Sequence, residues 1–168
     1  MGPFPHDAPA ATVSTDNPMG TDGFEFVEYA HPQAEALHAL FKLMGFAPVA
    51  RHKTKKITVY RQGDINYLVN EEPGSHGFEF VAAHGPCAPS MAFRVVDAKL
   101  AYERAIALGA EPAGVASEAK TLDVPAIKGI GGSLLYFVDR YGANGSAYDA
   151  EFEWLAGRDP HPVGAGLF

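Results

Sequence analysis

The apolar residues of this chain change spacing several times, and the changes predict a series of strands and helices. An aromatic, β-favouring stretch at residues 24–29 predicts a strand. A helix is predicted to begin at His31-Pro32, because proline is tolerated early in a helix. Its apolar stripe recurs at i, i+3, i+4 and i+7, at Leu37, Leu40, Phe41 and Met44. Three further strands are predicted, at residues 46–51, 57–61 and 65–70. A Gln62-Gly63-Asp64 turn joins the last two.

The second half of the chain repeats this order. A strand at residues 91–95 precedes a helix at 98–108, for which Asp97 is a suitable N-cap. The predicted buried stripe of that helix is Ala101, Ala105 and Leu108, flanked by Tyr102 and Ile106. Three strands are then predicted, at residues 112–116, 134–139 and 148–155. Both halves therefore read β-α-β-β-β.

The two predicted helices also end alike. Residues 44–48 read Met-Gly-Phe-Ala-Pro and residues 108–112 read Leu-Gly-Ala-Glu-Pro, so a glycine stops each helix and a proline prevents its resumption. Such an internal repeat favours a duplicated fold. We expect the α+β class, with two tandem βαβββ modules forming one curved mixed sheet, helices on its convex side and a concave cavity as the default ligand site.

The composition along the chain suggests where this domain lies. Residues 1–16 are rich in Pro, Ala, Ser and Thr and are expected to form a disordered leader. A single domain is expected over residues 17–168. It divides into module one at about 21–70, a connector at 71–89, module two at about 90–156, and a tail at 157–168. Within the connector, residues 78–83 fit a helix or a strand equally well.

Charge and cysteine content exclude several classes of function. The net charge is −7 and only residues 51–56 are locally basic, so no nucleic-acid partner is expected. No apolar stretch is long enough to span a membrane, and the first twenty residues lack both Lys and Arg and an apolar run. We therefore expect a soluble, cytoplasmic protein. The single cysteine, Cys87, permits no internal disulfide and is predicted to be unreactive.

Several stretches resemble one enzyme family. They lie at residues 17–20, 23–26, 60–66, 84–86, 91–95, 125–132, 135–140 and 162–167. The most specific is Pro-Ala-Ile-Lys-Gly-Ile-Gly-Gly at 125–132. Paired βαβββ modules define the vicinal-oxygen-chelate superfamily, and residues 17–168 resemble the amino-terminal half of 4-hydroxyphenylpyruvate dioxygenase within it. The resemblance implies conversion of 4-hydroxyphenylpyruvate and O2 to homogentisate and CO2 in tyrosine catabolism.

The same resemblance implies Fe(II), held by two His and one Glu in the carboxy-terminal half of the full-length enzyme. The first of these His residues is expected beyond Phe168. Aligned with a metal-binding module, this chain carries Gly23 and Ser90 at the first-strand positions and Glu151 at the last-strand position. One carboxylate cannot hold Fe(II) alone. No catalytic, cofactor-binding or metal-binding residue is therefore expected in this chain.

Other chemistry-bearing residues are given structural interpretations. The seven histidines show no ligand-like spacing; they are His6, His31, His38, His52, His76, His84 and His161. The carboxylates of Asp149, Glu151 and Glu153 alternate along one strand and are expected to be solvated or paired, with Arg94 and Arg140 as candidate partners. The glycines at 129–132 lead into a strand rather than a helix, so a phosphate loop is not expected.

Three functional hypotheses remain. The first is the amino-terminal domain of a 4-hydroxyphenylpyruvate dioxygenase, or of the related hydroxymandelate synthase, inactive alone and partnered by the catalytic domain within a homo-oligomer. The second is a stand-alone module that binds small aromatic compounds in the concave cavity. The third is a glyoxalase-type metal enzyme with ligands shared across a dimer, which the lack of His on predicted strands disfavours.

Overall fold

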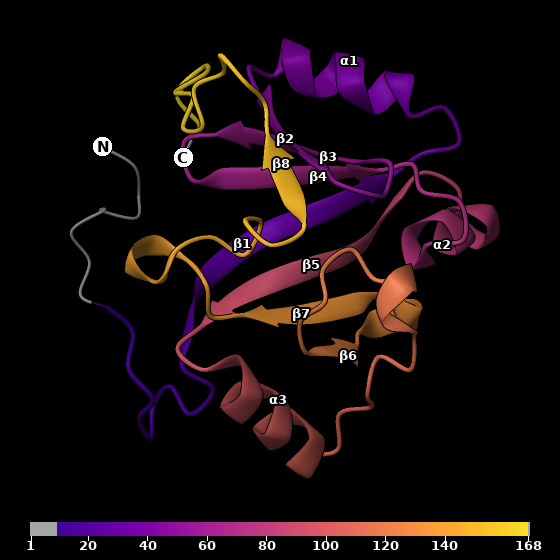
Figure 1. Ribbon diagram of the computed structural model, residues 1–168. Coiled ribbons are helices and arrows are strands. Elements are labelled where there is room, and N and C mark those ends of the chain that lie inside the picture. The colour runs from indigo at the N-terminus through magenta and orange to yellow at the C-terminus, as the bar shows by residue number, and fades with distance from the viewer. Residues whose placement is uncertain (1–9, 168) are drawn as a thin grey trace.

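Eight strands form one mixed sheet in the computed structural model, which describes residues 10–167 (Figure 1). Their order across the sheet is β6-β7-β5-β1-β4-β3-β2-β8. The predicted leader lies partly outside the described residues, at 1–9, and residues 10–16 contain no helix or strand. The mixed sheet with its three α-helices confirms the predicted α+β fold.

The first module has the predicted β-α-β-β-β order. Its elements are β1 (Thr21–Ala30), α1 (Glu35–Leu43), β2 (Ala47–His52), β3 (Ile57–Gln62) and β4 (Ile65–Asn70). β4 runs parallel to β1 and antiparallel to β3. Helix α1 begins later than predicted, because the His31 ring accepts the Gln33 N–H at 2.8 Å and holds residues 31–33 in a turn.

The second module repeats this arrangement with shorter strands. It contains β5 (Cys87–Val95), α3 (Ala98–Ala107), β6 (Ala126–Lys128) and β7 (Leu134–Val138). β7 is parallel to β5 and pairs with β6, and a single bridge joins Pro112 to Ile127. That bridge stands where module one has β2. The strand predicted at 112–116 does not form beyond it, since Gly114 has a φ of +68° and turns the chain.

The segment at 148–155 differs most from its prediction. Only Phe152–Trp154 is a strand, β8, and it pairs with β2 of the first module. In a regular strand Ala150 would share a face with Tyr148, yet Ala150 is exposed and Tyr148 is buried. Residues 148–152 form a turn instead, in which the Phe152 N–H donates to the Tyr148 carbonyl at 2.8 Å. The second half of the chain thus supplies the edge strand of the first.

Two helices bear on the predictions: one has the predicted N-cap, and the other decides between a helix and a strand at residues 78–83. Asp97 accepts the Leu100 N–H at 2.9 Å and caps α3, as predicted. Residues 78–83 lie in helix α2 (His76–His84), capped by Ser75 through the Phe78 N–H. Figure 1 shows α1 and α3 at opposite ends of the sheet.

Two leucines predicted in buried stripes are not buried. Leu108 is 74% exposed and Leu40 is 47% exposed. Leu108 follows the last turn of α3, where Gly109 at φ +96° redirects the chain, so its side chain leaves the stripe that Ala101 and Ala105 bury. Small alanines, rather than leucines, therefore bring α3 close to the sheet.

The tail is fixed to the first module by Gln62, whose side chain is fully buried. Gln62 Oε1 accepts the N–H groups of Ala165, at 2.5 Å, and Leu167, at 3.2 Å, and its Nε2 donates to the Met44 carbonyl at 3.0 Å. The Gly63 N–H donates to the Pro162 carbonyl at 2.8 Å. The tail therefore lies against the β3–β4 hairpin instead of projecting from the domain.

A buried carboxylate joins the two modules. Glu28 of β1 is 1% exposed. Its Oε1 accepts from Asn70 Nδ2 of β4 at 2.6 Å. Its Oε2 accepts from the Ser90 hydroxyl of β5 and from the Thr121 hydroxyl at 2.7 Å. Three donors from three segments thus satisfy one charge that burial alone would disfavour.

Replacing this carboxylate should destabilise the domain. We expect Glu28→Ala to lower the free energy of unfolding by about 3 kcal/mol, because it leaves a cavity and three buried donors without their acceptor. The isosteric Glu28→Gln should cost about 1 kcal/mol, since the hydroxyls of Ser90 and Thr121 can accept as well as donate. Urea unfolding measures both. Glu103→Ala, at an exposed position, is the control. If Glu28→Ala unfolds at the same urea concentration as this control, the network does not stabilise the domain.

Removing the tail's acceptor should release the tail locally. In Gln62→Ala, we expect the amides of Ala165 and Leu167 to exchange with solvent about tenfold faster or more, because their protein acceptor is lost. Hydrogen exchange followed by NMR measures this against the amide of Leu68 in the core. Gln33→Ala, at an exposed position, is the control. Equal acceleration at Leu68 would show global destabilisation instead of tail release.

Candidate functional site

The sheet face opposite α1 and α3 is filled by the chain's own side chains. Leu122, from the loop before β6, and Tyr148 are both fully buried there with Phe152 of β8. They pack on a cluster drawn from both modules, including Phe26, Val59, Leu68, Ala92, Leu134, Tyr136 and Val138. The prediction of an open concave cavity between the modules is therefore wrong. Strands were predicted at 112–116 and 148–155, yet Leu122, in the loop after the first, and residues 147–154 form the cover.

The three positions aligned with metal ligands have different surroundings. Gly23 is exposed in β1 at φ +93°. Ser90 is buried in β5 and donates to Glu28. Glu151 precedes β8, where it accepts the Asp123 N–H at 3.0 Å and lies 3.5 Å from His52 Nε2. The structure does not assemble them into one site.

The carboxylate that does lie beside Ser90 is Glu28, which the sequence interpretation missed. The available signal was a glutamate in the middle of an aromatic, β-favouring strand. Both of its oxygens accept hydrogen bonds from neutral side chains. Within residues 10–167, no three His, Cys, Asp or Glu side chains are grouped so as to hold a metal ion. Amide and hydroxyl groups around one carboxylate do not fit Fe(II), which favours imidazole and several anionic donors.

A second polar cluster is built around Glu25, which is 4% exposed. Arg94 Nε donates to Glu25 Oε2 at 2.6 Å, and Asn66 Nδ2 donates to the Glu25 carbonyl at 2.8 Å. Burial tends to lower the pKa of Arg94, but the Glu25 carboxylate reverses this, so the pKa is raised. Arg61 completes the cluster through Nε to Asn66 Oδ1 at 2.6 Å. These groups satisfy one another and secure the sheet.

Arg94 therefore does not pair with the acidic residues at 149–153, and Arg140 is exposed. Asp149 instead accepts the Trp154 Nε1–H at 3.1 Å and the Ser146 N–H at 3.3 Å. Together with the contacts of Glu151, these bonds are local supports of the segment around β8. Their carboxylates act as hydrogen-bond acceptors for neighbouring backbone and indole groups.

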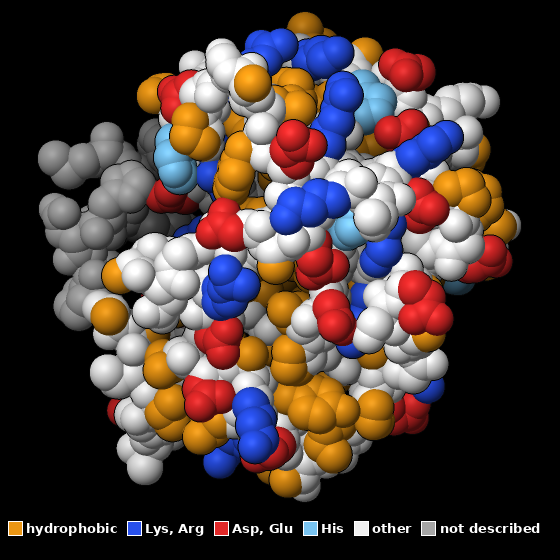
Figure 2. Space-filling model, in the orientation of Figure 1, with side chains coloured by type: hydrophobic (Ala, Val, Ile, Leu, Met, Phe, Trp, Pro, Cys, Tyr) orange, Lys and Arg blue, Asp and Glu red, His pale blue; other side chains and the backbone are white. Residues whose placement is uncertain are grey.

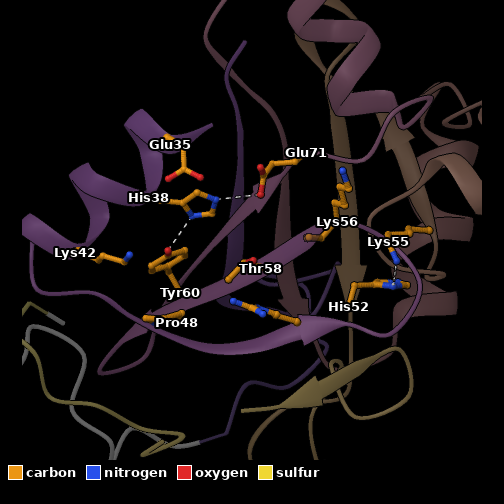
Figure 3. A pocket seen from close by; sticks show the side chains of 12 residues that line it. Glu35, His38, Lys42, Pro48, His52, Lys55, Lys56, Thr58, Tyr60 and Glu71 are labelled. Carbon is orange, nitrogen blue, oxygen red and sulfur yellow. Dashed lines mark hydrogen bonds and ion pairs between the residues drawn. The ribbon is translucent and has the colours of Figure 1, made fainter. Parts of the chain in front are cut away.

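A hollow of about 480 Å³ lies on the helix side of the sheet, between α1 and the β2–β3 hairpin (Figure 3). His38 of α1 stands in its wall, with Nδ1 2.8 Å from the Tyr60 hydroxyl and Nε2 3.0 Å from Glu71 Oε2. Because a carboxylate only accepts, Nε2 donates to Glu71, and in the neutral imidazole Nδ1 accepts a hydrogen bond from the Tyr60 hydroxyl. Burial raises the pKa of Tyr60 and keeps the hydroxyl proton in place.

Four Lys and Arg side chains also line this hollow. Its lining includes Lys42, Arg51, His52, Lys55 and Lys56, beside Glu35 and Glu71. The basic stretch at 51–56, which the sequence suggested was a solvated edge, thus forms one wall. On the face drawn in Figure 2, Lys and Arg side chains are interspersed with Asp and Glu.

A second hollow, of about 540 Å³, adjoins the first at Glu71. It lies between the start of α1 and helix α2, and its lining is mainly apolar, with Ala30, Pro32, Phe78, Val81 and Ala82. Phe78 is 46% exposed. The first hollow faces α1, whereas the second also includes Asn70, which donates to Glu28 Oε1.

The remaining candidates have local roles. His52 accepts the Lys55 N–H at 3.1 Å, and burial lowers its pKa. Burial likewise lowers the pKa of His76 in α2 and raises that of the Cys87 thiol, which keeps the thiol protonated. His6 lies outside the described residues. The glycines at 129–132 form a short 3-10 turn between β6 and β7 and lead into strand β7, as predicted, rather than into an α-helix.

No helix in the described part of the chain is long and apolar enough to cross a membrane.

Comparison with known proteins identifies the family to which this fold belongs. Residues 15–153 match the family described as hydroxyphenylpyruvate dioxygenase, HPPD, N-terminal. The chain is 51% identical over 152 residues to a 4-hydroxyphenylpyruvate dioxygenase of Pseudomonas sp. (strain P.J. 874), covering 90% of this chain and 43% of that protein. It thus spans less than half the length of that relative.

Two solved structures are similar. A xylose isomerase-like TIM barrel/4-hydroxyphenylpyruvate dioxygenase fusion protein matches with a TM-score of 0.71 and 35% identity, over 88% of this chain and 23% of that one. A mutant of 4-hydroxymandelate synthase from Streptomyces coelicolor matches with a TM-score of 0.62 and 21% identity, over 81% and 41%. The first supports the family and the second the fold alone. The chain belongs to the amino-terminal domain family of the hydroxyphenylpyruvate dioxygenases.

Proposed function

We propose that this domain is the non-metal half of a 4-hydroxyphenylpyruvate dioxygenase, which converts 4-hydroxyphenylpyruvate and O2 to homogentisate and CO2. The match to the amino-terminal family over residues 15–153 carries the proposal. The relative that is 51% identical bears the dioxygenase name, whereas the hydroxymandelate synthase shares 21% identity. The dioxygenase is therefore preferred to the synthase.

The proposal assigns Fe(II) to a carboxy-terminal half that this chain does not include. The packing of the sheet supports this assignment. Where a metal-binding module would direct ligands, Leu122, Tyr148 and Phe152 fill the space, and the Glu28 oxygens are already hydrogen-bonded. No reaction step is therefore assigned to a residue of this chain.

The role of this half is then to support the catalytic one. A rigid support needs two features: buried polar groups that are hydrogen-bonded, and a fixed point of attachment. The clusters around Glu28 and Glu25 supply the first. The tail provides that point, because Gln62 holds the backbone at Ala165 and Leu167. Any segment that follows would start from a defined position on the first module. The iron-bearing half and a second copy of the enzyme are the proposed partners.

The stand-alone aromatic binder depended on a concave cavity. Because that face is filled, no observation favours this second function over the first.

The isolated chain should not catalyse the reaction. With 4-hydroxyphenylpyruvate, Fe(II) and ascorbate, an oxygen electrode should record no uptake above the protein-free rate, since the donor set that iron needs is not assembled here. A full-length 4-hydroxyphenylpyruvate dioxygenase serves as the positive control. Iron-dependent turnover by the purified chain would contradict the proposal.

The source gene should encode the other half. Reading the transcript past the codon for Phe168 should reveal an open frame with two His and one Glu on predicted strands. A stop codon at that position, with no such segment in the frame, would overturn the assignment to a dioxygenase half.

A further inference from the structure

The hollow beside α1 gathers cations that have no partners. Among residues 10–167, no carboxylate lies within ion-pair distance of the Lys42, Arg51 or Lys56 side chains. Lys55, by contrast, is engaged, because its Nζ donates to the Lys120 carbonyl at 2.6 Å. Three positive charges without ion-pair partners thus line one hollow, from α1, from β2 and from the loop before β3.

The carboxylates of the hollow do not neutralise these charges. Glu71 is bound to His38 at 3.0 Å, and only Glu35 of the lining remains unpaired among the described residues. The chain as a whole carries a net charge of −7, so a local excess of positive charge runs against the overall balance. An excess of one sign in a hollow raises the local concentration of the opposite ion.

The shape and the remaining groups suit a small ligand. About 480 Å³ is within the usual range for small-molecule sites. Pro48 contributes apolar surface, and the Thr58 hydroxyl adds a donor. Figure 3 shows Lys42 and Lys56 to either side of Thr58 and Tyr60. The wall is rigid, because His38 is hydrogen-bonded on both ring nitrogens.

We propose that this hollow is a binding site for a small organic anion, carrying a carboxylate or phosphate group held by Arg51, Lys42 and Lys56. A guanidinium forms paired hydrogen bonds with either group, and the two ammonium groups add charge without fixed geometry. The site lies on the helix side of the sheet, away from the filled face. It does not depend on the dioxygenase assignment.

NMR titration of the isotopically labelled chain at low ionic strength tests the site, with inorganic phosphate and benzoate as separate probes. Saturable shifts at the amides of Arg51, Lys56 and Thr58 are expected with one or both probes. Saturation with phosphate alone would identify a phosphate-bearing ligand, and saturation with benzoate alone a carboxylate. Shifts that do not saturate, or that spread evenly over surface amides, would overturn the proposal.

Variants separate the site from general charge effects. Arg51→Gln and Lys56→Gln should each weaken binding about fivefold or more, whereas Lys99→Gln on α3, a matched surface change, should leave affinity unaltered. Glu35→Gln should strengthen binding about twofold, because it removes the unpaired negative charge. This gain cannot arise from unfolding. Equal affinities in the Arg51, Lys56 and Lys99 variants would overturn the assignment.

Discussion

The arrangement of the sheet depends on keeping one negative charge satisfied in a dry interior. Glu28 lies between the modules, and its hydrogen-bond donors lie 42, 62 and 93 residues away along the chain. A buried carboxylate without such donors would be strongly unfavourable, so β1, β4, β5 and the loop at Thr121 must come together for it to be accommodated. Burial, followed by the nearby Glu28 charge, raises the pKa of Tyr136, whose hydroxyl accepts the Thr121 N–H at 3.1 Å.

The same constraint also closes the face of the sheet opposite α1 and α3. Because Thr121 is tied to Glu28, the adjoining Leu122 is placed over the sheet, where it meets Tyr148 and Phe152. The same side chains that complete the core therefore fill the face of the sheet opposite α1 and α3. One face of the sheet is thus closed by packed side chains. On the side of α1, the charges of Lys42, Arg51 and Lys56 have no ion-pair partner among the described residues.

Much of the fold could be predicted from the sequence, because its signals are local. The strands of the first module, the Gly63 turn and the Asp97 cap follow from patterns within a few residues. The predictions that were wrong depend on distant contacts. Phe152–Trp154 is a strand because β2 offers an edge, and the cover formed by Leu122 is specified only by the folded sheet.

The candidate sites were less predictable for the same reason. Glu28 and Ser90 are 62 positions apart in the chain, and the unpaired cations of the hollow come from three elements. The sequence showed a basic stretch at 51–56 but not that Lys42 faces it across a hollow. The histidines His38, His52 and His76 lie in separate surroundings, beside Glu71, the Lys55 N–H and Phe80 respectively.

The central claim is the proposal that this domain holds no iron of its own, and the side chains that fill this face of the sheet support it. Anaerobic equilibrium dialysis of the purified domain against Fe(II) tests it most directly. The account predicts no stoichiometric iron retained, and the same result for Glu28→Gln. One iron bound per chain, lost when Glu28 is replaced by Gln, would contradict it.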